Sequence, residues 1–326
     1  MKSNREIIVS ALGARPPLDN PPPAGEHAVL RMIDFWRNQL AAVLPNHPDL
    51  IVLPEECDRY PEYTPEAYFE YLKYRGERIR DFFAEIACDH HCNFALCTRR
   101  AAGDGTWRTT TELIGRHGET VGAYNKNFHV PDETFPEPLL AGVNAPVIET
   151  EFGRVAMAIC FDLNFMELLE HYREARPNLI VFCSMYHGGL MQRFWAYRAG
   201  AYFIGAVCGN ECTIINPLGE LVAHSTNYFS HVTTTINLDY QLLHLDGNWE
   251  KLAAARQRYG REIEVSDPGQ LGCVMLTSHH PERSSKEITA EFGMENWREY
   301  YLRAQRYRFT PGEMEKTSTL PAHHRV

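Results

Sequence analysis

The sequence has no long apolar run and no excess of positive charge. No stretch approaches the roughly 18 uncharged apolar residues of a membrane-spanning helix, and the first ten residues turn polar too early for a secretory signal peptide. The 32 basic and 42 acidic residues give a formal net charge of −10, without the basic excess that binds nucleic acid or an anionic membrane. We therefore expect a cytoplasmic protein that acts on a small molecule.

Several sequence patterns of metal, disulfide and cofactor sites are also missing. The nine cysteines are odd in number and form no CxxC pair, which favours free thiols in a reducing compartment. No second ligand pair accompanies the one cluster that suggests zinc, Cys88, His90, His91, Cys92 and Cys97. Neither a glycine-rich phosphate loop nor a GxSxG elbow occurs. These absences argue against a structural zinc site, a phosphate-binding loop and a nucleophilic serine elbow.

Apolar runs alternate with segments of helical periodicity over the first 240 residues. Strands are predicted at 7–12, 48–54, 93–98, 178–183 and 203–208, with strand pairs about 116–119 and over 147–160, and a final hairpin over 212–238. Helices are predicted at 26–44, 65–90, 164–175 and 190–201. Strands that read as buried on both faces are typical of a sheet between other layers. Residues 1–240 are therefore predicted to form one α/β domain.

Residues 241–326 are predicted to form a C-terminal extension. It contains one amphipathic helical stretch at about 241–258, a loop with Pro268 and Gly269, and another helix at about 284–306.

Three predicted strands end at a residue of a reactive type. Glu55 follows DLIVLP, Lys126 follows TVGAYN and Cys160 follows RVAMAI, and ligands gather at the carboxyl ends of strands in open α/β sheets. There a cysteine can act as a nucleophile, a glutamate can move protons and a lysine can stabilise an oxyanion. Each residue alone fits a plainer role equally well, as a buried small hydrophobe or a solvated charge.

The residues around these three positions resemble the motifs of the nitrilase superfamily of carbon–nitrogen hydrolases, whose catalytic set is glutamate, lysine and cysteine in this order. The motifs are IVLPE at 51–55, YNKNFHVP at 124–131 and GRVAMAICFD at 153–162. Further matches are FME at 165–167, RAGA at 198–201 and NPLG at 216–219, so that the resemblance covers about residues 5–240. Asn125 stands where the family often has arginine, and Met166 where it has proline; neither touches the chemistry.

The resemblance implies a fold, a mechanism and an assembly. The fold is a four-layer α-β-β-α sandwich, and the assembly is a homodimer or higher homo-oligomer in which the extension 241–326 packs on the domain and on a partner subunit. Cys160 attacks the substrate carbon, Glu55 shuttles the proton, and Lys126 with the Phe161 N–H stabilises the oxyanion. No metal or cofactor is needed. A second active-site glutamate is expected between the lysine and the cysteine; Glu133 and Glu137 are candidates, and the spacing before Gly142 favours Glu137.

Substrate contacts are expected from the loop 184–193, which follows the strand NLIVFC and carries Tyr186 and His187. Three functions stay open. The first is an amidase or N-carbamoyl hydrolase that releases ammonia or an amine, the second a nitrilase that acts on a nitrile, and the third a catalytically silent binding protein with the same fold. The presence of all three catalytic residue types favours an enzyme, whereas the motifs do not separate an amide from a nitrile.

Overall fold

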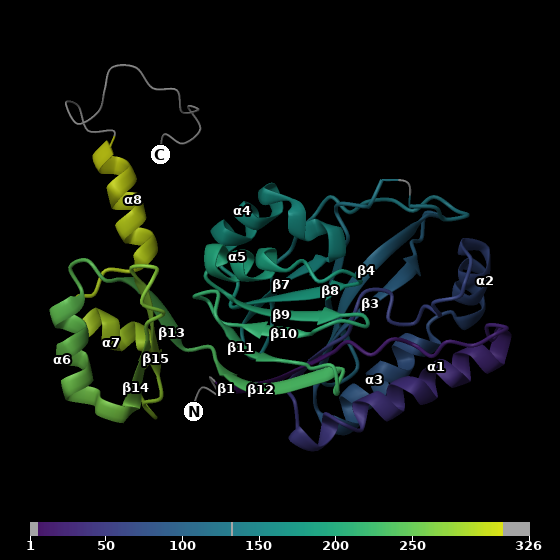
Figure 1. Cartoon of the computed structure of the whole chain (residues 1–326), viewed down its shortest axis with the longest axis horizontal. Helices are drawn as coiled ribbons and strands as arrows, with labels where there is room; N and C mark the ends of the chain where they lie inside the picture. Colours follow the sequence, from purple (N-terminus) through teal and green to yellow (C-terminus); the bar gives the residue numbers. More distant parts are fainter. Residues whose placement is uncertain (1–5, 132, 309–326) are drawn as a thin grey trace. The chain divides into compact units, whose positions relative to one another are not determined.

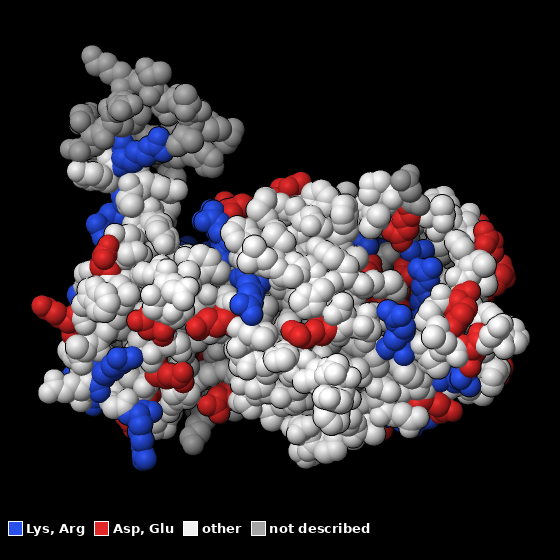
Figure 2. All heavy atoms as spheres, viewed as in Figure 1, with Lys and Arg blue, Asp and Glu red and all other residues white. Residues whose placement is uncertain are grey.

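The computed structural model of the protein describes residues 6–131 and 133–308. The chain divides into two compact units, a larger one over Asn4–Leu238 and a smaller one that begins at Asp239 (Figure 1). Among the described residues, no helix is both long and apolar enough to cross a membrane. Basic and acidic side chains are interspersed on the face of the larger unit drawn in Figure 2, and neither sign forms a continuous field there.

Two six-stranded sheets form the centre of the larger unit. The first has the order β12-β1-β2-β3-β4-β5, in which β1, β2 and β3 run parallel and the outer pairs are antiparallel. Its strands are β1 (Glu6–Leu12), β2 (Leu50–Val52), β3 (Asn93–Ala101), β4 (Trp107–Ile114), β5 (Thr120–Asn125) and β12 (His231–Asn237).

The second sheet has the order β11-β10-β9-β8-β7-β6, with β7, β8 and β9 parallel. Its strands are β6 (Ile148–Glu149), β7 (Arg154–Ile159), β8 (Leu179–Ser184), β9 (Tyr202–Val207), β10 (Thr213–Ile215) and β11 (Leu221–His224). The sheets face each other, because β1 and β2 contact β8 and β9. Every residue of β2, β8 and β9 is buried, which explains why these strands are continuous apolar runs.

Helices cover the outer face of each sheet (Figure 1). The helices α1 (Gly25–Leu40), α2 (Pro65–Arg75) and α3 (Arg78–His90) belong to the first sheet, and α4 (Met166–Ala175) and α5 (Leu190–Ala199) to the second. Two short 3-10 turns, η1 (Leu44–Asn46) and η2 (Cys160–Asn164), precede β2 and α4. Trp36, Phe83 and Phe94 pack ring against ring in the core beneath α1 and α3. The predicted four-layer α-β-β-α sandwich is confirmed.

Two predictions for the larger unit are wrong. The helix predicted over 65–90 is divided into α2 and α3 at Gly76, whose φ of 53° belongs to a backbone conformation that favours glycine. The hairpin predicted over 212–238 ends early, because only β10 and β11 form it. The following strand, β12, joins the other sheet and pairs with β1 in antiparallel register.

The smaller unit is a three-stranded antiparallel sheet with helices. The strand order is β13-β15-β14, formed by β13 (Tyr240–His244), β14 (Ile263–Ser266) and β15 (Cys273–Ser278). The other elements are α6 (Trp249–Tyr259), η3 (Gly260–Glu262), α7 (Ser285–Glu291) and α8 (Trp297–Arg308). Leu243, Leu276 and Ile288 belong to its own core.

The helix predicted over 241–258 is therefore wrong in its first half, which is β13. The helix predicted over 284–306 is two helices, with Gly293 at a φ of 59° between them. Homo-oligomer formation and the packing of the extension on a partner subunit stay predictions.

Candidate active site

The structure brings Glu55, Lys126 and Cys160 together at the carboxyl ends of strands. Glu55 lies in the turn after β2, Lys126 directly follows β5, and Cys160 directly follows β7. The Lys126 Nζ lies 2.7 Å from Glu55 Oε1, and the Cys160 thiol lies close enough to the same carboxylate that each affects the pKa of the other. Glu55 and Lys126 are buried, and Cys160 is half-buried. The group therefore joins residues of both sheets around one carboxylate.

The three groups set one another's protonation. Desolvation raises the pKa of Glu55 against the opposing charge of Lys126, and the charge of Glu56 raises it further. Desolvation and the charge of Glu55 raise the pKa of Cys160 to about 12, while Lys126 acts in the other direction. Desolvation opposes the charge on Lys126, but Glu55 and Cys160 outweigh it and raise the lysine pKa. At neutral pH the lysine is charged and the thiol holds its proton, so a base must remove that proton before the sulfur can act as a thiolate.

A buried carboxylate below the thiol fixes the turn that carries Cys160. Cys160 has a φ of 48° and begins the turn η2. Asp162 accepts hydrogen bonds from the Ile159 N–H at 2.9 Å, the Phe128 N–H at 2.8 Å and the Tyr124 hydroxyl at 2.7 Å. These bonds tie the cysteine turn to the segment that carries Lys126. Sequence reasoning gave Asp162 no role, although it lies within the quoted cysteine motif.

Phe161, the expected oxyanion donor, directly follows Cys160. Its N–H lies in the first turn of η2, where amide groups have no acceptor within the helix. Its half-buried ring meets Phe165 edge-on at 5.4 Å, and Phe165 stacks on Phe128 at 3.7 Å. Three aromatic rings thus lie next to the segments that hold the thiol and the lysine.

The loop after β8 reaches the same carboxylate. The Met185 N–H donates to Glu55 Oε2 at 3.2 Å. Burial raises the pKa of Tyr186, and its buried hydroxyl has no hydrogen-bond partner among the described residues. His187 instead lines a separate cavity of about 340 Å³ with residues of α5, β10 and β11.

The two candidate glutamates of the loop 130–146 have different surroundings. The side chain of Glu133 is 22% exposed, pairs with Arg99 and lies 3.6 Å from His129 Nδ1. Desolvation acts to raise its pKa, but the nearby His129 and the charges of Arg99 and Lys126 lower it to about 2. Glu137 is exposed on the same loop. Of these two glutamates, Glu133 is the one whose charge and that of Lys126 act on each other, whereas the spacing favoured Glu137.

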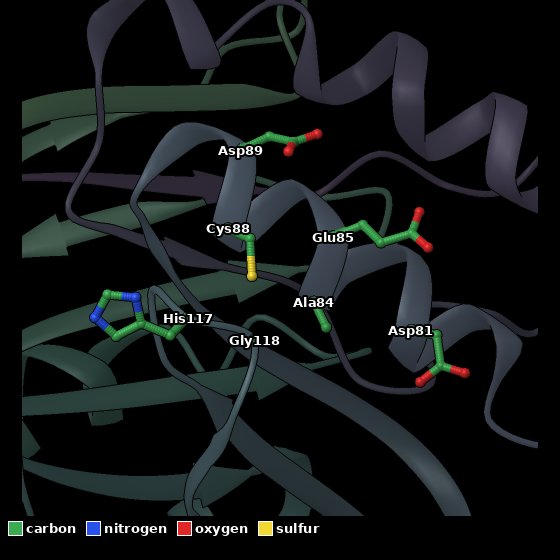
Figure 3. A pocket seen from close by; sticks show the side chains of 7 residues that line it. All are labelled: Asp81, Ala84, Glu85, Cys88, Asp89, His117 and Gly118. Atoms are coloured by element: carbon green, nitrogen blue, oxygen red, sulfur yellow. The ribbon is translucent and has the colours of Figure 1, made fainter.

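The cysteine and histidine cluster at 88–97 lies elsewhere. Cys88 borders a cavity of about 550 Å³ beside α3, and Figure 3 shows its sulfur pointing toward the turn of His117 and Gly118 while the side chains of Asp81 and Glu85 point away. Cys92 and Cys97 are buried. Over residues 6–131 and 133–308, no three His, Cys, Asp or Glu side chains are grouped to hold a metal ion.

Sequence comparisons identify a family and distant relatives. The profile of the carbon–nitrogen hydrolase family matches residues 29–243. A protein named hydrolase in agr operon from Staphylococcus lugdunensis is 24% identical over 208 residues, which cover 59% of this chain and 88% of that protein. The chloroplastic omega-amidase of Arabidopsis thaliana is 24% identical over 194 residues, or 52% of this chain, and the match spans about half of the relative, 51%.

A solved structure shares the fold. The Nesterenkonia AN1 amidase from the nitrilase superfamily superposes with a TM-score of 0.60 at 16% sequence identity, over 79% of this chain and 98% of that one. In another structure of the same amidase, the acetamide moiety of fluoroacetamide is covalently added at the active-site cysteine.

Proposed function

Because the chain belongs to the carbon–nitrogen hydrolase family, we propose that it hydrolyses an amide or N-carbamoyl bond of a small molecule through a thioester on Cys160. The observation that carries this proposal is the contact of one buried carboxylate, Glu55, with both the Cys160 thiol and the Lys126 ammonium. A nucleophile and a cation that each interact with one base form the minimum set for acyl transfer.

In the first half-reaction, Glu55 takes the proton of the Cys160 thiol while the sulfur attacks the carbonyl carbon. The carbonyl oxygen becomes an oxyanion, which Lys126 and the Phe161 N–H stabilise. Glu55 then returns the proton to the substrate nitrogen, the C–N bond breaks, and ammonia or an amine leaves. Because the pKa of the thiol is about 12, few free thiolates exist at neutral pH, and the base must act together with the attack.

In the second half-reaction, water attacks the thioester carbon. Glu55 accepts a proton from the water, the same cation and N–H hold the second oxyanion, and the C–S bond breaks. The proton returns to the Cys160 sulfur as the carboxylic acid leaves. One carboxylate thus serves both halves, which requires that it contact the sulfur and face the substrate carbon.

The comparisons support an amide rather than a nitrile as the substrate. One relative is named an omega-amidase, and the amidase that shares the fold takes up an acetamide moiety on its active-site cysteine. The sequence identity of 16–24% leaves the particular amide to experiment.

The test is ammonia release from a panel of aliphatic amides, N-carbamoyl compounds and nitriles. We expect release from amides or carbamoyl compounds that falls by about a thousandfold or more in C160A, because the nucleophile is lost. Mass spectrometry of the quenched reaction should show an acyl group on the Cys160 peptide. Release from nitriles alone would indicate a nitrilase. Silence across the panel, without an acylated peptide, would contradict the proposal and favour the silent binding protein.

A further inference from the structure

A buried arginine joins two loops on either side of the candidate active site. Arg99 lies near the end of β3, and its side chain is 3% exposed. Its Nε forms an ion pair with Glu56, in the loop after β2, and its Nη2 hydrogen-bonds Glu133, in the loop after β5. One guanidinium therefore holds two carboxylates from segments that are far apart in the sequence.

Each of these carboxylates acts on a different member of the catalytic group. Glu56 directly follows Glu55, and its charge adds to the rise of the Glu55 pKa. The charge of Glu133 acts on Lys126. The carboxyl group of Glu133 is ionised at neutral pH, since its pKa is about 2. Arg99 thus lies between two negative charges, of which one acts on Glu55 and the other on Lys126.

The guanidinium is fixed by packing. Its Cζ lies 4.7 Å from the centre of the Phe135 ring and 5.6 Å from that of Tyr68. Glu56 is held as well, since a second cation, Arg59, contacts its other carboxylate oxygen at 2.9 Å. A planar cation in contact with two carboxylates and two rings has little freedom to move, so it is suited to position its partners.

We propose that Arg99 is a positioning residue, which holds the carboxylates of Glu56 and Glu133 beside the Glu55–Lys126 pair and balances their charge. This role rests on the function proposed above. Arg99 does not contact the thiol; it acts through the two glutamates. Without it, Glu56 would keep only Arg59 as a close cationic partner, and Glu133 would lose the guanidinium that it shares with Glu56, so that more negative charge would act on the catalytic carboxylate and the thiol.

The expected effect has a definite sign. Negative charge near Glu55 disfavours its ionised form, so loss of Arg99 raises the pH at which Glu55 can take the thiol proton. The other titratable groups around Glu55 are Lys126, Cys160, Cys97 of β3 and Cys208 after β9. None of these is paired with Arg99 in the hydrogen bonds and ion pairs of the described residues, so they stay in place when Arg99 is replaced.

The test follows alkylation of Cys160 by iodoacetamide as a function of pH in the full chain, with peptide mass spectrometry to separate the nine thiols. We expect R99M to move the midpoint to higher pH and to slow alkylation at pH 7 about tenfold, as one pKa unit would. The double variant R99M/E56Q should recover most of the wild-type midpoint, because it removes one of the two negative charges that Arg99 balanced.

Arg75 supplies the matched control. It is also buried, pairs with a carboxylate of the same loop, Asp58, and lies within the same unit. R75M should lose a similar share of stability and keep the alkylation midpoint within about twofold in rate at pH 7. An equal shift in R75M and R99M, or no shift in R99M, would overturn the proposal.

Two further outcomes keep the test decisive. If R99M does not fold, E56Q replaces it in the test. This variant removes a negative charge beside Glu55, so the pH midpoint of Cys160 alkylation should fall. An unchanged midpoint in E56Q would overturn the proposal. Alkylation needs no substrate. If wild type hydrolyses no amide while R99M still shifts the midpoint, the proposed function fails and the role of Arg99 in the charge balance stands; amide hydrolysis with no shift in R99M overturns the Arg99 proposal alone.

Discussion

Two buried ion pairs begin in one short loop of this protein. Glu55 pairs with Lys126 at 2.7 Å, and Asp58 pairs with Arg75 at 2.6 Å. The carboxylates are three residues apart, and all four side chains are at most 6% exposed. Burial and distance therefore do not distinguish the two pairs.

Their third partners distinguish them. Glu55 contacts the Cys160 thiol and the Met185 N–H, whereas Asp58 contacts the hydroxyl of Tyr68, on the helix α2. A phenol inside the core offers no nucleophile to activate. The comparison indicates that the proposed chemistry depends on the thiol beside Glu55 and not on the buried ion pair alone.

Replacing the carboxylate of each pair by its amide gives the largest expected contrast in kcat. E55Q and D58N each leave a buried cation without its counter-ion, which costs on the order of 3–5 kcal/mol of stability. We expect E55Q to lose about 10²- to 10⁴-fold in kcat, because the base is gone. D58N should keep kcat within about threefold when folded. Urea unfolding with amide hydrolysis measures both quantities; an equal loss of kcat in folded D58N would erase the distinction.

The acid side of the pH profile sharpens the comparison. Desolvation raises the pKa of Glu55 above its ordinary value of 4.5, and the protonated carboxyl cannot accept the thiol proton. The value of kcat/KM should therefore fall about tenfold per pH unit on the acid side, with its midpoint above 4.5. D58N should show the same midpoint. A midpoint at or below 4.5 would indicate that another group limits the reaction.

Substitutions of Glu133 and Glu137 test which charges of the loop 130–146 affect the Glu55–Lys126 pair. E133Q removes a carboxylate that interacts with Arg99 and Lys126, so we expect kcat/KM to fall by about tenfold. E137Q changes an exposed residue and should stay within about twofold. The reverse order of the two variants would assign the second active-site glutamate to Glu137.

The smallest expected effects on the kinetic constants are those of substitutions in the loop 184–193, where substrate contacts are predicted. Y186F and H187A should raise KM a few-fold and leave kcat within about twofold, because neither side chain contacts the proton path from Cys160 to Glu55. Steady-state kinetics on the best amide of the panel measures both constants. Unchanged KM in both variants would remove this loop from the substrate site.

The strand ends that hold Glu55, Lys126 and Cys160 could be predicted because local signals agreed. Each residue follows an apolar run, and parallel strands deliver their carboxyl ends to one edge of a sheet. The contact among the three side chains crosses the two sheets, and no local pattern contains it. Arg99 illustrates the same limit: its neighbour Arg100 looks equivalent in sequence but pairs with Glu77 and Glu112 instead.

The smaller unit was predicted less well, for a related reason. Leu242 and Leu243 of β13 continue the apolar spacing of α6, so the two elements were merged into one helix. The strand β15 is buried throughout, and a buried strand lacks the alternation that identifies a strand with one exposed face. The break at Gly76 was missed because glycine within a helical pattern is often tolerated.

The left-handed backbone conformation of Cys160 opposes the proposed activity of this residue to the stability of the fold. A side chain at a φ of 48° is disfavoured relative to glycine by roughly 1–2 kcal/mol. A protein that no longer needed the thiol would gain stability if glycine replaced Cys160. That single substitution would abolish the proposed activity. The residue proposed as the nucleophile is therefore also one whose replacement by glycine would stabilise the fold.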